Sequence, residues 1–174
     1  GNFDGRDHKL ANAEISQAGI DYIAIFRKIE ASAVVENLSI ENINIIGRHY
    51  TAALVGYSAG KVQNIQVSGN IQGSNNTGGI VGRVWVGSAD LGVYDSSSSA
   101  IIVGGQWTGG IVGWSRGASY DGNSATGKVT GANRTGGLIG VADGSSIIKN
   151  SFATGAVHAP SYIVGGLIGG ANGA

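Results

Sequence analysis

The sequence predicts an all-β protein in the form of a parallel β-solenoid, and three observations support this. A pentapeptide of two glycines, two aliphatic residues and a third glycine recurs at 78–82, 109–113, 136–140 and 165–169. The segments between its copies alternate apolar and polar residues, as half-buried strands do. Glycine accounts for 32 of the 174 residues, and no stretch has the length or pattern of a crossover helix. A repeat of this length is typical of solenoids, propellers and arrays.

Weaker copies extend the repeat towards the N-terminus, as AALVG at 52–56 and IAIFR at 23–27. The steps between equivalent residues are 29, 26, 31, 27 and 29. We therefore expect a single domain, residues 1–174, of about five coils of 26–31 residues with partial coils at both ends. Stacked parallel strands would make each coil rise by roughly 4.8 Å.

Residues 1–22 lack the pentapeptide and are predicted to form an opening coil. Within them, Lys9–Ser16 has residues that a short helix would also accept. The repeat context favours a strand.

A second extended segment follows each pentapeptide, and its copies align without gaps at 64–73, 95–104, 122–131 and 150–159. The copy at 37–47 carries one extra residue. Small residues inside these segments predict a bend at Gly69, Gly127 and Gly155. A recurrent amide or carboxylate predicts a turn whose side chain bonds to local backbone or to the next coil; this column comprises Asn37, Asn64, Asp95 and Asn150.

Neighbouring residues of an extended strand point to opposite faces. If Ile80 points inward, the alternate residues of each copy point outward. Stacked from coil to coil, they form a column of threonines, a column of valines or isoleucines, and a column of the residues that follow the pentapeptide. This predicts an exposed association face, made of Thr51, Val55, Tyr57, Thr77, Val81, Thr108, Val112, Trp114, Thr135, Ile139 and Ile168. Arg83 and Val141 share this register. Two alternatives remain open: the leucine and isoleucine column is outside instead, or the chain covers the stripe at a bend or with its first coil.

Composition excludes several classes of function. The formal net charge is zero, which gives no electrostatic footprint for nucleic acid and favours self-association. There is no cysteine, so disulfides and thiolate metal sites are impossible. No apolar run approaches 18 residues, and we expect no membrane insertion.

We find no catalytic or cofactor-binding pattern. His8, His49 and His158 occupy different coil positions and are not expected to converge on a metal. The segment Gly122–Lys128 is close to a phosphate-binding loop, but Val129 follows and no helix does, so we interpret it as a repeat strand. The serines at 96–99 have no histidine base nearby. The chain is predicted not to be an enzyme and to need no cofactor.

The pentapeptide, together with Asn150–Gly155 and the opening Phe3–Gly5 and His8, resembles the GLUG repeat family of bacterial surface and secreted proteins. That family includes haemagglutinin-like adhesins and the non-catalytic region of IgA-specific metallopeptidases. The resemblance covers essentially the whole chain and implies a right-handed parallel solenoid in an extracellular or cell-surface protein. Peptidase activity does not carry over, because no HExxH is present. The run DSSSS at 95–99 departs from the family segment, and we expect weaker core packing there.

The favoured function is a stiff structural module, either part of a bacterial surface stalk or a unit that self-assembles end to end. The last segment carries no capping helix or charge cluster, so the chain is either cut from a longer array or completed by another subunit. The alternative is an adhesin-type module that binds a glycan or a host protein. It would use the predicted protruding loop Trp85–Leu91 or the scattered aromatics Tyr57, Tyr94, Trp107, Trp114 and Tyr162. Ice binding through the threonine column is a further alternative. Asn37, Asn75 and Asn133 lie in glycosylation sequons.

Overall fold

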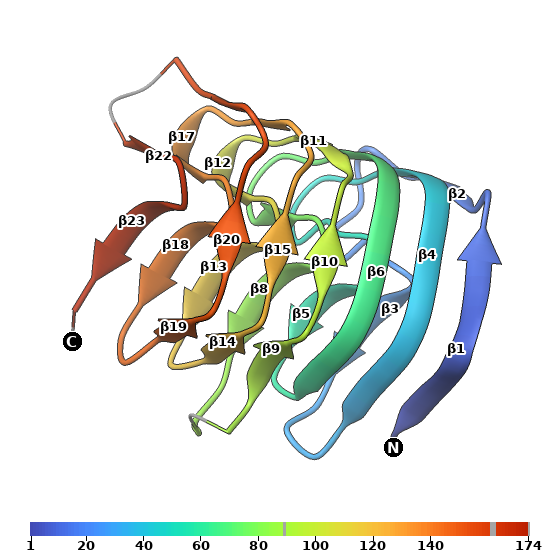
Figure 1. Ribbon diagram of the computed structural model, residues 1–174. Helices are drawn as coiled ribbons and strands as arrows, with labels where there is room; N and C mark the ends of the chain where they lie inside the picture. The colour runs from blue at the N-terminus through green and yellow to red at the C-terminus, as the bar shows by residue number, and fades with distance from the viewer. Residues whose placement is uncertain (89, 161–162, 174) are drawn as a thin grey trace.

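The computed structural model describes residues 1–88, 90–160 and 163–173, and every regular element within them is a β-strand. All the strand pairs in these ranges are parallel. The chain winds through six coils that lie side by side in sequence order, with the two termini at opposite ends of the stack (Figure 1). The predicted parallel β-solenoid is therefore confirmed, as is the strand at the start of the chain.

Three sheets form the walls of the solenoid, each taking strands from successive coils. The wide sheet contains β1 (Phe3–Ala11), β2 (Glu14–Ser16), β4 (Val34–Ile46), β6 (Lys61–Gln72), β9 (Gly92–Tyr94), β10 (Ser97–Ser98), β11 (Ile101–Val103), β14 (Ser119–Asp121), β15 (Ser124–Ala125), β16 (Val129–Thr130), β19 (Ile147–Lys149), β20 (Phe152–Ala153) and β21 (Val157–His158). The narrow sheet contains β7 (Thr77–Gly78), β12 (Gln106–Gly109), β17 (Asn133–Gly136) and β22 (Val164–Gly165). The third sheet contains β3 (Phe26–Ile29), β5 (Val55–Ser58), β8 (Val81–Trp85), β13 (Val112–Arg116), β18 (Ile139–Asp143) and β23 (Ile168–Asn172).

The pentapeptide forms the sharp corner between the narrow sheet and the third sheet. In one coil β7 ends at Gly78 and β8 begins at Val81, so two residues make the whole turn. A side chain at Gly78 would collide with the carbonyl oxygen of Val81, and one at Gly110 would collide with that of Gly137 in the next coil. Glycine is required here because backbone fills the space that a Cβ would occupy.

A ladder of left-handed residues marks the bend within the wide sheet. Asn37, Asn64, Asp95 and Asn150 have φ of 57°, 51°, 48° and 45°, a conformation that asparagine tolerates better than most residues. The amide nitrogen of Asn64 donates to Oδ1 of Asn37 at 2.8 Å, and that of Asn37 to Oδ1 of Asp4 at 2.9 Å. The predicted turn column, with bonds from coil to coil, is confirmed over this part of the stack.

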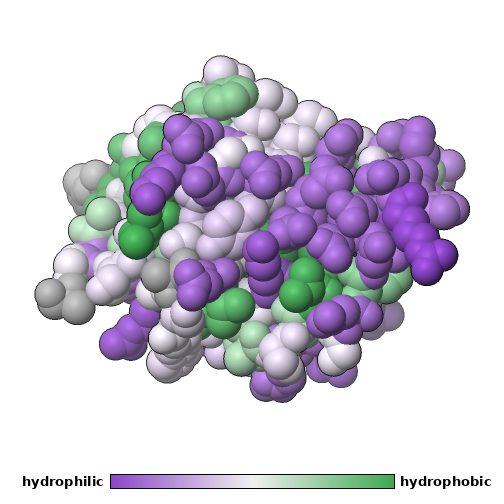
Figure 2. Space-filling model, turned by 60° about the horizontal axis from the view of Figure 1, so that its bottom comes forward, coloured by the Kyte–Doolittle hydropathy of each residue, from purple (hydrophilic) through white to green (hydrophobic). Residues whose placement is uncertain are grey.

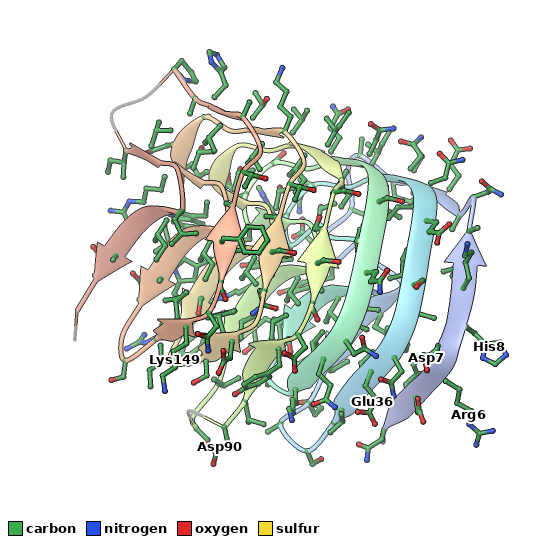
Figure 3. The ribbon with its side chains drawn as sticks, in the orientation of Figure 1. Arg6, Asp7, His8, Glu36, Asp90 and Lys149 are labelled. Carbon is green, nitrogen blue, oxygen red and sulfur yellow. The ribbon has the colours of Figure 1, made fainter. Side chains whose placement is uncertain are left out.

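The ladder changes in the fifth coil, where Gly122, with φ of 69°, occupies the equivalent position. Because this glycine has no side chain, the amide of Asn150 bonds instead to Oδ1 of Asp121, at 2.8 Å. At the other end of the stack, β1 makes a kink between Asp4 and His8, where Arg6 and His8 point away from the stack and Asp7 lies on the side of β4 (Figure 3).

The serine-rich run at 95–99 places two of its serines in the interior, where both have hydrogen-bond partners. Ser96 and Ser98 are buried, and Oγ of Ser96 accepts the backbone N–H of Ile65 at 3.1 Å and donates to the carbonyl of Tyr94. The buried Asn123 accepts the N–H of Ser96 with its Oδ1. Side-chain hydrogen bonds therefore replace apolar contacts at this level. Buried polar groups that all find partners pack without a large penalty.

Candidate functional site

The residues predicted to form an exposed association face are mostly inside the molecule. Eight of the eleven are fully buried, which corrects that expectation; they are Thr51, Val55, Thr77, Val81, Thr108, Val112, Thr135 and Ile139. The column formed by the first aliphatic residue of each pentapeptide, from Leu54 to Leu138, is buried too. The alternation rule fails because the pentapeptide is a corner rather than a strand, so both of its aliphatic side chains enter the core. The alternative in which the chain covers the stripe at a bend is the one observed.

The threonine column packs against a column of glycines four residues earlier in the chain, at the turn that leads into the narrow sheet. A side chain at Gly73 would meet Oγ1 of Thr77, and one at Gly104 would meet that of Thr108. The hydroxyls of Thr77 and Thr108 donate to the backbone carbonyls three residues earlier, at 3.3 and 3.1 Å. A column that is fully buried cannot contact ice, and ice binding through it is therefore excluded.

The three histidines lie in different parts of the solenoid. Nδ1 of His8 lies 3.0 Å from the carbonyl oxygen of Gly5 within the kink of β1, and Nδ1 of His49 accepts the N–H of Asn75 at 3.3 Å. His158 is exposed on β21. Within residues 1–88, 90–160 and 163–173 no three of His, Cys, Asp and Glu come close enough to hold a metal ion. The segment Gly122–Lys128 is part of the wide sheet through β15, which confirms its interpretation as a repeat strand.

The outer face of the third sheet carries the most distinctive side chains of the molecule. Arg83 and Trp85 on β8 lie opposite Trp114 and Arg116 on β13, so each arginine has a tryptophan beside it in the next coil. The intervening Val84 and Ser115 are buried, which leaves the four larger side chains on the outside. We call Arg83, Trp85, Trp114 and Arg116 the aromatic–arginine cluster.

The geometry of the cluster shows stacked cations and rings. The guanidinium carbon of Arg83 lies 4.4 Å from the ring centre of Trp114 and 4.9 Å from that of Trp85. The guanidinium carbon of Arg116 lies 5.4 Å from the ring centre of Trp85. The two indoles meet edge to face at 6.1 Å. Such contacts stabilise a cation over a ring by about 0.5–2 kcal/mol each, so the cluster is held in a fixed arrangement.

The cluster continues along the third sheet in both directions. Towards the N-terminus, Arg83 donates to the hydroxyl of Tyr50 at 3.4 Å, and the rings of Tyr50 and Tyr22 stack 4.5 Å apart. Towards the C-terminus, Nε1 of Trp114 donates to Oδ2 of Asp143 at 2.8 Å, and the amide of Asn172 donates to the other oxygen at 2.7 Å. Neutral donors therefore occupy both oxygens of this carboxylate.

Two shallow hollows adjoin the cluster. The first has a volume of about 330 Å³ and is lined by Trp85, Val86, Gly87, Ser88, Arg116, Gly117, Gly144 and Ser145. The second, of about 210 Å³, lies between Arg116, Asp143, Gly144, Asn172 and Gly173. Arg116 borders both. Gly117 and Gly144 have φ of 70° and 62°, and their lack of side chains keeps the floor of the first hollow open.

The sequence reasoning found part of this cluster and missed the rest. Tyr57 and Trp114 were expected to be outside and are half-exposed, while Ile168 is half-buried in the last strand. Trp107 is half-buried in β12, Tyr94 lies under the ammonium group of Lys61 on the wide sheet, and Tyr162 lies outside the described residues. The pairing of Trp85 with Arg116 was missed, although alternation within β8 and β13 places both residues on the side of Arg83 and Trp114.

The predicted loop after β8 is exposed at Gly87, Ser88 and Asp90, and Figure 3 shows Asp90 on the connection that extends below the sheet. At Asn37, the amide nitrogen that a glycan would occupy is engaged in the ladder. Within the described ranges the structure contains no helix of a length and apolarity suited to crossing a bilayer.

Comparison with known proteins supports the fold and the repeat. Residues 131–157 match the family model of the GLUG motif, which covers one coil from the end of β16 to β21. A stretch of 101 residues, 58% of this chain, is 36% identical to halomucin from Haloquadratum walsbyi and covers 1% of that protein. A crystal structure from Bacteroides ovatus, provisionally assigned as an immunoglobulin A1 protease, superposes with a TM-score of 0.82 at 24% identity. That match covers 98% of this chain and 58% of the other, so the chain spans less than two thirds of both relatives.

Proposed function

Since this chain carries the GLUG motif within a β-solenoid, we propose that it is a non-catalytic structural module of a surface or secreted protein. The observation that carries the proposal is the unbroken parallel pairing from β1 to β21 across the wide sheet, repeated from β3 to β23 in the third sheet. Such a stack resists bending because every coil is hydrogen-bonded to its neighbours over most of its perimeter.

Side chains add to this resistance. Beside the backbone pairing, Asn64 bonds to Asn37 on the outer surface, and Ser96 bonds to the backbone of β6 in the interior. Each of these bonds joins residues 27 or 31 positions apart in sequence. Each bond is therefore broken only if one coil separates from the next.

The comparisons support a location in a large extracellular protein. The segment that resembles halomucin is 1% of that protein, so a module of this kind occurs within a very long chain. The GLUG match and the halomucin match together favour a surface or secreted protein for this chain as well.

Pulling the protein from its two ends in a single-molecule force experiment tests the structural role. We expect unfolding in steps, each releasing one coil of about 27 residues, or roughly 90 Å of extended chain. A protein that extends at low force without discrete steps would contradict the proposal. Circular dichroism on the same preparation would verify that the strands were present before pulling.

End-to-end association of copies is the second candidate, and the sixth coil favours it. Leu167 is 37% exposed, whereas the equivalent Leu138 is fully buried beneath the next coil. Val164 and Ile147 are exposed on the same coil. At the other end, Phe3, Phe26, Ala33 and Val35 line a hollow of about 390 Å³. Figure 2 shows hydrophilic side chains crowded over the N-terminal coils on its right and paler or hydrophobic ones towards the C-terminal coils.

Sedimentation velocity over a range of concentrations tests this second candidate. We expect species larger than the monomer to grow with concentration, and Leu167→Lys to reduce them strongly. The matched control is Val103→Lys, which alters a residue that is 43% exposed on the wide sheet, away from the ends of the stack. A chain that stays monomeric at high concentration, or equal effects of both variants, would reject end-to-end association.

A further inference from the structure

The first hollow beside the aromatic–arginine cluster has the composition of a small binding site. Its volume of about 330 Å³ falls at the lower end of the range for ligand pockets, roughly 300–1,000 Å³. Such pockets combine apolar and aromatic walls with a few polar groups that fix orientation. Here Trp85 and Val86 provide the apolar wall, and Ser88, Ser145 and Arg116 provide the polar groups.

The two arginines of the cluster have no ion-pair partner among the described residues. The ion pairs among the described residues are Lys9–Glu41, Lys28–Glu30 and Arg48–Asp21, and none involves Arg83 or Arg116. Asp143 lies opposite Arg116 in the neighbouring strand, but its carboxylate accepts hydrogen bonds from Trp114 and Asn172. The carboxylate of Asp90 accepts a hydrogen bond from Ser88 at the rim of the hollow. Arg116 therefore borders the hollow without an ion-pair partner, and its guanidinium group can pair with an anion.

The exposed indole of Trp85 and the open floor of the hollow favour a sugar ring over a peptide. Trp85 is 45% exposed, so part of its indole is free to stack on a ligand. Gly117 and Gly144 leave the floor without side chains, as a ring lying against the indole requires. The apolar C–H face of a sugar ring stacks on an indole, and its hydroxyls can bond to Ser88 and Ser145 at the rim.

From these observations we propose that the third sheet binds an acidic carbohydrate, a sugar ring that bears a carboxylate. The ring lies against Trp85, and its carboxylate pairs with the guanidinium of Arg116, which borders both hollows. Arg83 contacts both indoles and so helps to hold Trp85 in place. This binding role goes beyond the structural role proposed above and does not depend on it.

Titration with oligogalacturonate, a chain of carboxylated sugars, tests the proposal, with maltohexaose as the neutral sugar. Tryptophan fluorescence or calorimetry near physiological salt gives the affinity. We expect oligogalacturonate to bind at least tenfold more tightly than maltohexaose. Trp85→Ala and Arg116→Gln should each weaken its binding by tenfold or more, and Trp85→Phe by less than Trp85→Ala. Lys149→Gln, which removes one positive charge from the wide sheet, should leave binding unchanged.

The other outcomes overturn the proposal. Equal binding of the two sugars would indicate a site for neutral sugars, and no binding of either at millimolar concentration would exclude a carbohydrate site of this kind. Equal loss in Lys149→Gln and Arg116→Gln would show only non-specific attraction between charges. Equally tight binding of hexaglutamate would indicate an acidic peptide site. Thermal melting of each variant ensures that the losses are compared between folded proteins.

Discussion

The side-chain amide of Asn64 donates a hydrogen bond to Oδ1 of Asn37, and both residues have left-handed backbone conformations. The two functions of the side chain can be separated by substitution. Asn64→Ala removes the bond and forces alanine into a conformation that costs it about 1–2 kcal/mol. Asn64→Gly removes the bond, worth about 1 kcal/mol, but accepts the conformation. Urea unfolding should therefore show a larger loss of stability for alanine than for glycine. Equal losses would show that the left-handed backbone carries no cost here.

Thr108 and Thr135 occupy equivalent positions in neighbouring coils but differ in their hydrogen bonds. Oγ1 of Thr108 donates to the carbonyl of Gly105 at 3.1 Å, whereas the buried Oγ1 of Thr135 has no partner. We expect Thr108→Val to destabilise the protein by about 1 kcal/mol and Thr135→Val to be neutral or stabilising by up to about 1 kcal/mol. Measured under the same conditions, the free energy of unfolding should fall in Thr108→Val and should stay unchanged or rise in Thr135→Val. A loss of equal size in both variants would contradict the assignment.

Burial raises the pKa of the Tyr120 hydroxyl well above its usual value, although its hydrogen bond to Oγ of Ser115, at 2.6 Å, acts in the opposite direction. Up to pH of about 10, Tyr120 is protonated in both the folded and the unfolded chain and has no effect on the pH dependence of stability. Above that, the unfolded chain loses this proton and the folded protein keeps it. Stability should therefore fall, by at most about 1.4 kcal/mol per pH unit from this group.

The Tyr120→Phe variant isolates that contribution. Its stability should fall less steeply than that of the unmodified protein when urea unfolding is repeated between pH 9 and 11.5. In a spectrophotometric titration of the folded state, both proteins should release the same number of phenolic protons up to pH 11. One proton fewer from the variant would show that Tyr120 ionises while the protein is folded.

Gly110 and Gly166 have the same position in the pentapeptide but different surroundings. A Cβ at Gly110 would collide with the carbonyl oxygen of Gly137 and lie 2.6 Å from Cβ of Ala125. No atom lies within 4 Å of the corresponding point at Gly166. Gly110→Ala should destabilise the protein by about 3 kcal/mol or more, and Gly166→Ala by less than about 0.5 kcal/mol. A severe loss in monomeric Gly166→Ala would show that the sixth coil is packed differently from this structure.

The repeat and the strand pattern predicted the architecture because a column of equivalent residues leaves a periodic signal. The asparagine column was predictable for the same reason. Asn37 and Asn64 recur at one position of the repeat because the backbone there is left-handed, a conformation that asparagine tolerates. The faces of the pentapeptide were not predictable from alternation. Whether Val81 points in or out depends on how β7 and β8 meet at the corner, which is a tertiary property.

The aromatic–arginine cluster shows the same limit at the site. Arg83 and Trp114 follow the pentapeptide at one register and could be aligned from the repeat. Trp85 and Arg116 each lie three residues after a pentapeptide, so the same alignment pairs them, although the insertion that lengthens this repeat to 31 residues follows directly after Trp85. The proximity of Trp85 to Arg116 depends on how far β8 and β13 continue before they turn.

Parallel stacking gives the solenoid little length for each residue of the chain. One repeat, from Gly109 to Gly136, takes 27 residues to add roughly 4.8 Å of height, whereas the same residues drawn out straight would span about 90 Å. A protein that only needed to hold something far from a cell would be better served by a thin tether. Many such repeats in one polypeptide would instead produce a broad solenoid. Each added coil would extend its side surface, where the exposed side chains can vary independently of those in other coils.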